Sequence, residues 1–226
     1  MPYSQEFGDH FYCRTDGRLE CGHVFLSGNS LPDRWREMAS GSRFRIGELG
    51  FGTGLNFCET WRQWKRARAP GAHLHFTSFE LYPMKRDEID RALARWPEID
   101  VERQALAEAW PDEPMGQVTI ALDEQTRLTV VCGAALDGVT AAEPDFDAWF
   151  LDGFAPSRNP AMWSPELMQM LFDRTRPGGS FATYAAAGFV RRNLGAAGFI
   201  VERRPGFAGK REMLCGTRPD LLPAGD

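Results

Sequence analysis

The sequence predicts an α/β protein in which helices cover both faces of a mostly parallel, doubly wound sheet. Residues 44–49 form a β-prone apolar run, a glycine-rich turn follows, and residues 55–68 have helical spacing up to a stop at Pro70-Gly71. The same alternation recurs further along the chain. Because parallel strands need helical crossovers that bury both sheet faces, this pattern favours a doubly wound sheet.

The remaining elements follow the same periodicities. Further strands are expected at 75–79, 117–122, 128–132, 148–151 and 180–184, and further helices at 84–95 and 165–174. Residues 199–203 and 211–215 flank a Pro-Gly turn at 205–209. They predict an antiparallel pair that ends the sheet.

One domain is expected, since no repeat, low-complexity tract or linker interrupts the 226 residues. We divide the chain into an N-terminal extension (1–43) packed on the core, a main domain (44–218) and a C-terminal tail (219–226). Within the extension, a hairpin is expected to pair residues 11–13 with 23–25.

Composition narrows the class of protein. No apolar run approaches the roughly 20 residues of a membrane-spanning helix, and the N-terminus lacks the features of a secretory signal. The five scattered cysteines contain no CxxC pair and suit reduced thiols. We therefore expect a cytoplasmic protein that binds no membrane.

Charge is unevenly distributed. The net charge of -5 alone disfavours a nucleic-acid partner, yet residues 174–218 hold nine basic and only two acidic residues. This end of the chain can attract phosphate, although adjacent basic residues are commonly just a solvated face. The candidate phosphate contacts are the pairs Arg191-Arg192, Arg203-Arg204 and Lys210-Arg211.

The glycine-rich turn carries the most information about a ligand. Gly50, Gly52 and Gly54 follow Glu48 in a GxGxG spacing, which differs from the dinucleotide GxGxxG and lacks the Lys-Ser/Thr of a phosphate-binding loop. Such a turn lets the backbone approach a ligand at a helix N-terminus. It fits S-adenosylmethionine, and Glu48 either sets the loop or meets the cofactor's ammonium. Asn56, which closes this string, is a further candidate for binding the cofactor. The alternative to a cofactor site is a bare turn between strand and helix that binds no ligand.

Two further carboxylates end predicted strands. Glu80 can accept hydrogen bonds from both ribose hydroxyls, and its alternative is a surface glutamate. Asp152 follows the buried-looking strand 148–151. Ligands of α/β sheets bind beyond the carboxyl ends of the strands, which is where Asp152 lies. It is the candidate catalytic residue, because an aspartate can orient an amine and accept its proton. Its alternative is a cap of the turn before Gly153.

Aromatic side chains accompany the same sheet edge. Phe154, Trp163, Tyr184 and Phe207 lie in or beside predicted loops, where they can stack on an unpaired base or pack in the core. His73 and His75 have no third partner at suitable spacing, so no metal site is expected.

From Tyr3 to Gly216 the chain resembles the methyltransferase domain of the MnmC family. The matching strings are 3–9, 24–29, 48–57, 147–160, 162–163, 187–192 and 210–214. The resemblance implies a seven-stranded fold of the class I S-adenosylmethionine-dependent methyltransferase type. It also implies methylation of 5-aminomethyl-2-thiouridine at the tRNA wobble position to 5-methylaminomethyl-2-thiouridine, with Asp152 beside the acceptor amine and the anticodon region of tRNA as the partner.

The sequence departs from the family pattern at three alanines. Gly133 matches, but Ala134 follows it where the resemblance implies an aspartate that holds the adenine amino group, and Asp137 is the nearest substitute. Ala161 stands where an acidic residue is expected, and Ala185 where a hydroxyl is expected.

Alternatives to this function stay open. Many relatives are fused to a flavin-dependent oxidase; here we expect a stand-alone methyltransferase or a fragment, with any oxidase partner encoded separately. The three alanines are also compatible with a methyltransferase of the same fold that acts on a small-molecule or protein amine. A third reading is a non-catalytic tRNA- or cofactor-binding module.

Overall fold

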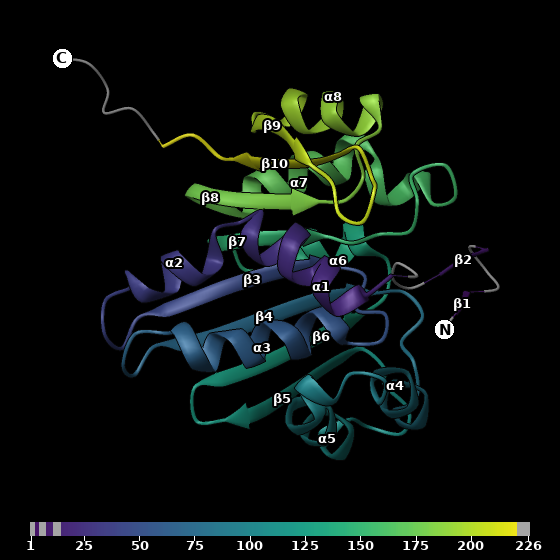
Figure 1. Cartoon of the computed structure of the whole chain (residues 1–226). Coiled ribbons are helices and arrows are strands. Elements are labelled where there is room, and N and C mark those ends of the chain that lie inside the picture. Colours follow the sequence, from purple (N-terminus) through teal and green to yellow (C-terminus); the bar gives the residue numbers. More distant parts are fainter. Residues whose placement is uncertain (1–2, 5–7, 11–14, 221–226) are drawn as a thin grey trace.

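The computed structural model describes residues 3–4, 8–10 and 15–220. Within them, one eight-stranded sheet has the order β5-β6-β4-β3-β7-β8-β10-β9 (Figure 1). Its strands are β3 (Arg43–Leu49), β4 (His73–Glu80), β5 (Gln117–Asp123), β6 (Thr126–Cys132), β7 (Phe146–Leu151), β8 (Thr175–Thr183), β9 (Ile200–Pro205) and β10 (Glu212–Thr217). The five strands from β6 to β8 pair in parallel, whereas β5, β10 and β9 run antiparallel to their neighbours. The short strands β1 (Tyr3–Ser4) and β2 (Asp9–His10) form a separate antiparallel pair.

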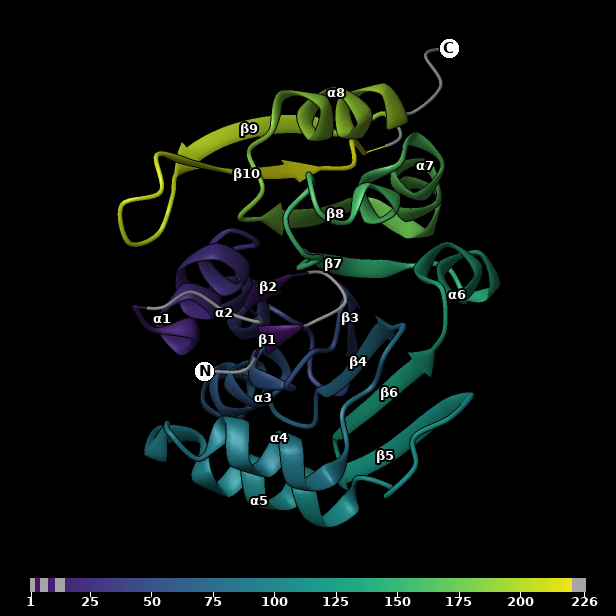
Figure 2. The same cartoon turned by 90° about the vertical axis from the view of Figure 1, so that its right-hand side faces the viewer.

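Helices cover both faces of the sheet. Figure 2 shows α1, α2 and α3 on one side and α6 and α7 on the other. The helical elements are α1 (Gly17–Cys21), η1 (Gly22–Ser27), α2 (Leu31–Arg36), α3 (Leu55–Ala67), α4 (Arg86–Leu93), η2 (Pro97–Ile99), α5 (Asp100–Ala109), α6 (Ala135–Ala141), η3 (Pro160–Trp163), α7 (Pro165–Arg174) and α8 (Gly188–Ala197). None of the described helices is both long and apolar enough to cross a bilayer.

Each sheet face has its own apolar core. Trp35 of α2 and Trp64 of α3 are fully buried on one face, with their ring centroids 5.4 Å apart. Leu167 of α7 and Leu194 of α8 pack on the other face around Trp149 of β7. The predicted doubly wound α/β fold is therefore confirmed.

The sheet has eight strands rather than seven. The polar turn after Asp123 folds β5 back onto β6, and their register runs from Gln117 opposite Val131 to Asp123 opposite Thr126. This hairpin adds an antiparallel edge strand beside the parallel strands. The other expected strands lie where the sequence predicted them, with ends that differ by a few residues.

The hairpin expected in the N-terminal extension is not formed as predicted. Residues 11–13 lie outside the described residues, and 23–25 belong to the π-helical segment η1. The Asp16 side chain instead caps α1 by accepting hydrogen bonds from the N–H groups of Arg18 and Leu19. The consecutive apolar residues 24–26 are therefore buried as part of a helical segment and not of a strand.

Candidate functional site

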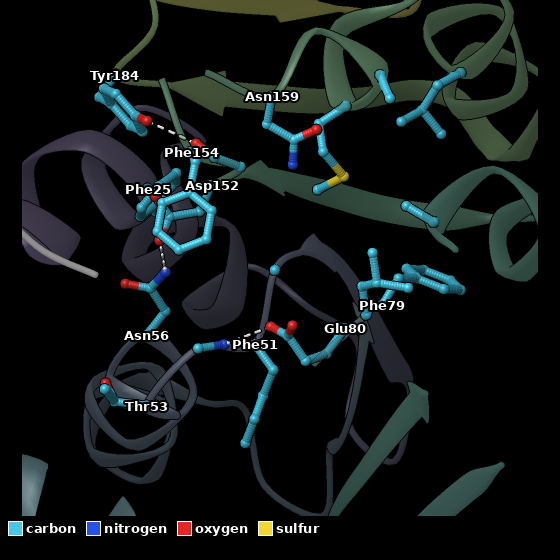
Figure 3. Close-up of a pocket in the computed structure, with 18 of the residues that line it drawn as sticks. Phe25, Phe51, Thr53, Asn56, Phe79, Glu80, Asp152, Phe154, Asn159 and Tyr184 are labelled. Atoms are coloured by element: carbon cyan, nitrogen blue, oxygen red, sulfur yellow. Dashed lines mark hydrogen bonds between the residues drawn. The ribbon is translucent and has the colours of Figure 1, made fainter. Parts of the chain in front are cut away.

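A cavity of about 320 Å³ opens at the carboxyl ends of the parallel strands (Figure 3). Its volume falls within the range of ligand pockets, about 300–1,000 Å³. The topology brings most of the candidate residues together here, although they are far apart in the sequence. Nine of them line it: Gly50, Gly52, Asn56, Glu80, Gly133, Asp152, Phe154, Tyr184 and Lys210.

The glycine loop takes a conformation that suits glycine. Gly50, Gly52 and Gly54 have φ angles of 88°, 53° and 77°, in the left-handed region that other residues rarely adopt. A Cβ on Gly50 would lie 3.0 Å from the carbonyl oxygen of Asp152. Gly54 precedes α3 and lies behind the lining, where a Cβ would come within 2.9 Å of the Leu106 side chain. Gly50 and Gly52 thus bring backbone rather than side chains to the cavity wall.

Glu80 holds this loop from the end of β4. Its Oε2 accepts a hydrogen bond of 2.9 Å from the Gly52 N–H, and its Oε1 accepts one of 2.8 Å from the Tyr82 N–H. Figure 3 shows the first of these bonds at the cavity wall. Each carboxylate oxygen has two lone-pair sites, so both oxygens can still accept a hydroxyl of a ligand.

Asn56 of α3 joins the buried carboxylate of Glu48 to the partly buried carboxylate of Asp152. Its Nδ2 donates to Asp152 Oδ2 at 2.7 Å and to Glu48 Oε1 at 3.0 Å. Glu48 Oε2 also accepts a bond of 2.7 Å from Ser78 Oγ. Glu48 is fully buried and does not line the cavity, which favours a role in setting the loop over direct contact with a cofactor. Burial raises the pKa of the Glu48 carboxyl well above its ordinary value.

Asp152 faces the cavity from the end of β7. Burial raises the pKa of its carboxyl well above the ordinary value, and the negative charge of Glu20 raises it further. The bond from Asn56 and the charge of Lys210 act in the opposite direction on this pKa. A carboxylate in this setting accepts protons more readily than an exposed one.

The aromatic candidates divide into two groups. Phe154 and Tyr184 line the cavity, and the Tyr184 hydroxyl donates a bond of 2.6 Å to the carbonyl oxygen of Gly153. Trp163 is buried beneath the loop, where its Nε1 donates to the carbonyl oxygen of Phe154 at 3.0 Å. The side chain of Phe207 packs against the core, 5.9 Å from the ring of His23. The last two side chains have core or scaffolding positions.

The basic candidates also separate. Lys210 lines the cavity, and its Nζ pairs with Glu20 Oε1 at 2.8 Å. Arg203 and Arg204 form ion pairs within the terminal strands. The exposed side chains of three other arginines have no hydrogen bond or ion pair among the described residues and do not line the cavity: Arg191, Arg192 and Arg211.

The three alanines lie at or near the cavity. Ala134 lines it as the N-cap residue of α6 and supplies no side-chain hydrogen bond to that helix. Asp137 is exposed and does not line the cavity, so it does not replace an aspartate at 134. Ala161 is a lining residue, whereas Ala185 is buried behind the lining.

Sequence reasoning missed a second group of lining residues. They come from the N-terminal helices, the segments after β4 and β6, and the loop after β7: Gly17, Glu20, Cys21, Phe25, Leu81, Leu136, Asn159 and Met162. Phe25, Asn159 and Met162 stand in strings that resemble the family, but no motif assigned any of the eight to a ligand, because they reach the cavity through tertiary packing. Within the described part of the chain, no group of three or more His, Cys, Asp or Glu side chains is arranged to hold a metal ion.

A glycine loop, a strand-end carboxylate and a cavity at the carboxyl edge of a doubly wound sheet define a protein that binds a nucleoside-bearing cofactor. Residues 97–219 match the model of a family described as S-adenosyl-L-methionine-dependent methyltransferase. The chain belongs to this family.

The chain is also similar to named bacterial proteins. The chain is 46% identical over 219 residues to a protein of Chromohalobacter salexigens named tRNA 5-methylaminomethyl-2-thiouridine biosynthesis bifunctional protein MnmC, covering 95% of this chain and 31% of the relative. It is 42% identical over 226 residues to the protein of that name from Caulobacter vibrioides, covering 99% of this chain and 37% of the relative. The chain thus spans about a third of the length of these relatives.

The fold is shared with a solved structure. The crystal structure described as MNMC2 from Aquifex aeolicus superposes with a TM-score of 0.79 at 21% sequence identity, covering 99% of this chain and 68% of that one. The cofactor of the family is S-adenosylmethionine. The site fits it, because Gly50 and Gly52 present backbone without side chains to the cavity and Glu80 presents acceptors beside them.

Proposed function

We propose that this protein transfers a methyl group from S-adenosylmethionine to the primary amine of 5-aminomethyl-2-thiouridine at the wobble position of tRNA. The observation that carries the proposal is the placement of Asp152, whose carboxylate is held by Asn56 in the same cavity as the glycine loop. The relatives' name specifies biosynthesis of 5-methylaminomethyl-2-thiouridine. That product carries a methylated amine, which a methyltransferase would make by adding a methyl group to the corresponding primary amine.

The cavity residues are assigned to the two substrates as follows. Gly50 and Gly52 would hold the amino-acid end of the cofactor, and Glu80 would accept hydrogen bonds from its ribose hydroxyls. Gly133 follows β6 on the same edge and would border the adenine. Phe154 and Tyr184 would contact the acceptor nucleoside from the opposite wall, since aromatic rings commonly stack on unpaired RNA bases.

Asp152 would act on the acceptor amine. When bound, the cofactor would supply a methyl group activated by a sulfonium, which the amine nitrogen would take up while the electron pair of the broken carbon–sulfur bond stays on sulfur. Asp152 accepts a hydrogen bond from the amine, directs its lone pair and takes up the proton that the product nitrogen releases. Burial supports the uptake, because it raises the pKa of the Asp152 carboxyl. Alignment of the reacting groups supplies most of the remaining catalysis.

Phosphate contacts would come from the arginines that have no partner among the described residues. Arg191 and Arg192 lie in the first turns of α8, and Arg211 follows the loop residue Lys210. Their exposed guanidinium groups can pair with the phosphates of the anticodon stem-loop. Lys210 instead contributes to the cavity through its ion pair with Glu20.

The test is methyl transfer from labelled cofactor to tRNA that carries 5-aminomethyl-2-thiouridine, read by mass spectrometry of the wobble nucleoside. The Asp152→Asn variant keeps an oxygen that accepts from Asn56. It should bind the cofactor normally in calorimetry and lose about 10²–10⁴-fold in turnover, the usual contribution of general acid–base catalysis. The matched control is Asp147→Asn, a buried aspartate at the opposite end of β7 that does not line the cavity.

Other outcomes separate the alternatives. Near-normal turnover by Asp152→Asn would remove Asp152 from the mechanism. A wild-type protein that binds the cofactor but leaves this tRNA unmethylated would point to a small-molecule or protein amine. Failure to bind the cofactor at all would favour a non-catalytic tRNA-binding module.

A further inference from the structure

A row of basic side chains crosses three neighbouring strands at the end of the sheet opposite the cavity. The register places Arg43 of β3 beside His73 of β4, and Arg45 of β3 beside His75 of β4. On the other side of β4, His75 lies beside Arg127 of β6. Arg43 and Arg127 are exposed, and the other three side chains are half-buried. We call this set the basic face: Arg43, Arg45, His73, His75 and Arg127.

The basic face lies on the side of the sheet that α3 does not cover. The residues that alternate with its members, such as Phe44, Leu74 and Leu128, are buried in the core beneath α3. On the outward side, the core under α6 and α7 takes Leu49 from β3 and Phe79 from β4, both near the carboxyl ends. Figure 2 shows α6 and α7 near β7 and β8. Within the described chain, the amino-terminal halves of β3, β4 and β6 therefore turn one face to solvent.

One end of the basic face is partly neutralised. The Arg45 side chain donates a hydrogen bond of 2.6 Å to the Pro144 carbonyl oxygen, and the Arg45 backbone N–H donates to Asp147 Oδ2 at 2.7 Å. Asp147 also pairs with Arg176 at 2.8 Å. The exposed residues on either side of Pro144 are acidic as well: Glu143 and Asp145. Counter-charges therefore gather at the β7 end of the row.

The rest of the basic face lacks such partners. Four of its members form no ion pair or side-chain hydrogen bond with other described residues: Arg43, His73, His75 and Arg127. Asp123, at the end of β5, accepts a hydrogen bond from Trp61 Nε1 and so turns toward α3. Burial, and then the positive charges of Arg43, Arg127 and Arg45, lower the pKa of His75 to about 4. The cations are thus close enough to act on one group, and together they favour an anion on this face.

The basic face lies within reach of a long ligand held in the cavity. Arg43 and Arg45 precede Gly50 by a stretch of extended strand that spans about 17–23 Å. α6 starts at the cavity, where Leu136 lines the wall, and its Val139 packs on the same side of the sheet as the basic face. A polymer that leaves the cavity past α6 can therefore run over the amino-terminal halves of the strands. A single nucleoside is too small to touch both places.

We propose that the basic face binds phosphates of the substrate tRNA outside the anticodon loop. The inference rests on the proposed function for the identity of the RNA and adds a second contact to it. The guanidinium groups of Arg43 and Arg127 match the geometry of phosphate oxygens, and the rings of His73 and His75 supply N–H donors between them. RNA is favoured over an acidic protein because the proposed function already brings a polyanion to the cavity. The chain is acidic overall, so a polyanion has to be held by local rows of cations such as this one.

The test measures how tRNA binding responds to salt. Full-length tRNA carrying 5-aminomethyl-2-thiouridine is titrated by fluorescence anisotropy with wild type, Arg43→Gln, Arg127→Gln and the double variant, between about 50 and about 200 mM salt. Each phosphate contact contributes about 0.7–0.9 to the slope of log K against log salt. The double variant should lose about 1.4–1.8 of this slope, so the advantage of wild type in affinity shrinks about tenfold over the range. An unchanged slope overturns the proposal.

Arg66→Gln is the matched control. Arg66 is an exposed arginine of α3, on the opposite side of the sheet, and its side chain forms no ion pair or hydrogen bond with other described residues. This variant should keep the wild-type slope, and a loss equal to that of Arg43→Gln would show that any surface charge has the effect, which overturns the proposal. Denaturant unfolding checks that each variant is folded. If one single variant does not fold, the other carries the same test.

A shorter RNA separates the basic face from the cavity. An anticodon-loop oligonucleotide with the same modified nucleoside enters the cavity but ends before the basic face. With this RNA the double variant and wild type should have equal salt slopes, and a loss of slope here would show that the substitutions disturb the cavity, which overturns the proposal. If wild type methylates the tRNA and the double variant keeps the wild-type slope, this inference fails alone. If wild type neither binds nor methylates the tRNA, the proposed function fails with it.

Discussion

Glu80→Gln tests how the cofactor is held, because this carboxylate supports the loop and faces the cavity at once. Its two oxygens accept from the backbone N–H groups of Gly52 and Tyr82. Glutamine keeps one oxygen and replaces the other with an NH₂ group, which cannot accept. One of the two N–H groups then loses its partner and faces a second donor. The side chain also loses the acceptor that would receive one ribose hydroxyl.

The expected magnitude follows from these contacts. The glutamine oxygen can keep the bond from the Gly52 N–H, so the bond that is lost is the exposed one from the Tyr82 N–H or the one to the ligand, at about 0.5–1.5 kcal/mol. If this cost falls on the bound state, the Kd for S-adenosylmethionine rises by about 2–13-fold, since 1.4 kcal/mol corresponds to tenfold. Isothermal calorimetry with the cofactor and with its demethylated product measures the change directly. Both ligands should weaken alike, because Glu80 lies at the ribose position proposed here rather than at the transferred methyl.

The matched control uses a similar bond at an exposed position. Glu88 Oε2 accepts from the Lys85 N–H at 2.9 Å in the first turn of α4, outside the cavity lining. Glu88→Gln should leave the cofactor Kd unchanged. An unaltered Kd in Glu80→Gln would refute the assignment of Glu80 to the cofactor. An equal loss in Glu88→Gln would show that the effect is not local.

Two further predictions concern the pH dependence of the unfolding free energy and the contact with the adenine of the cofactor. Glu48→Gln can still accept from Asn56 and can donate to Ser78 Oγ. Because burial raises the folded-state pKa of Glu48, its carboxyl contributes stability that is present below the unfolded pKa of about 4.3 and is lost as pH rises through the folded pKa. Denaturant unfolding at acidic and alkaline pH should therefore show the variant gaining stability relative to wild type as pH rises, and a constant difference would contradict this. Ala134→Asp should cap α6 and raise the unfolding free energy by about 0.5–2 kcal/mol, and it should also tighten cofactor binding several-fold in calorimetry. Stabilisation without tighter binding would place the adenine elsewhere.

The sheet and the cofactor half of the cavity were predictable from the sequence for a shared reason. Parallel strands end at one edge, so Gly50, Glu80 and Asp152 had to meet once three strands were assigned. The hydrogen bond from the Gly52 N–H to Glu80 and the 3.0 Å approach of a Gly50 Cβ to Asp152 both follow from that meeting. Apolar runs and glycine turns, which are local signals in the sequence, indicated where each strand begins and ends.

Several helices were not predictable in the same way. The sequence analysis assigned no helix to α5, α6 or α8, and it interpreted residues 23–25 as a strand. In α8 the buried positions Val190, Leu194 and Ala197 keep helical spacing, but Gly188 and Gly195 weaken the local preference for a helix. Packing of these apolar side chains on the sheet stabilises α8 despite its two glycines. In the extension, tertiary burial of Val24 and Phe25 decides between two conformations that the local pattern leaves open.

The acceptor side of the cavity depends on contacts between the two ends of the chain. Such contacts leave no local motif in the sequence, so they could not be predicted from it. Glu20 and Lys210 are 190 residues apart in sequence, yet they form the ion pair at the rim. The basic neighbours of Lys210 predict a phosphate contact, and only the docking of the β9–β10 loop on α1 shows that Lys210 also lines the cavity. The strands and glycine turns of the doubly wound sheet therefore predict where a methyl donor binds. In the proposed function the acceptor contacts elements outside that repeating unit, so the sheet and the glycine loop do not by themselves define the acceptor.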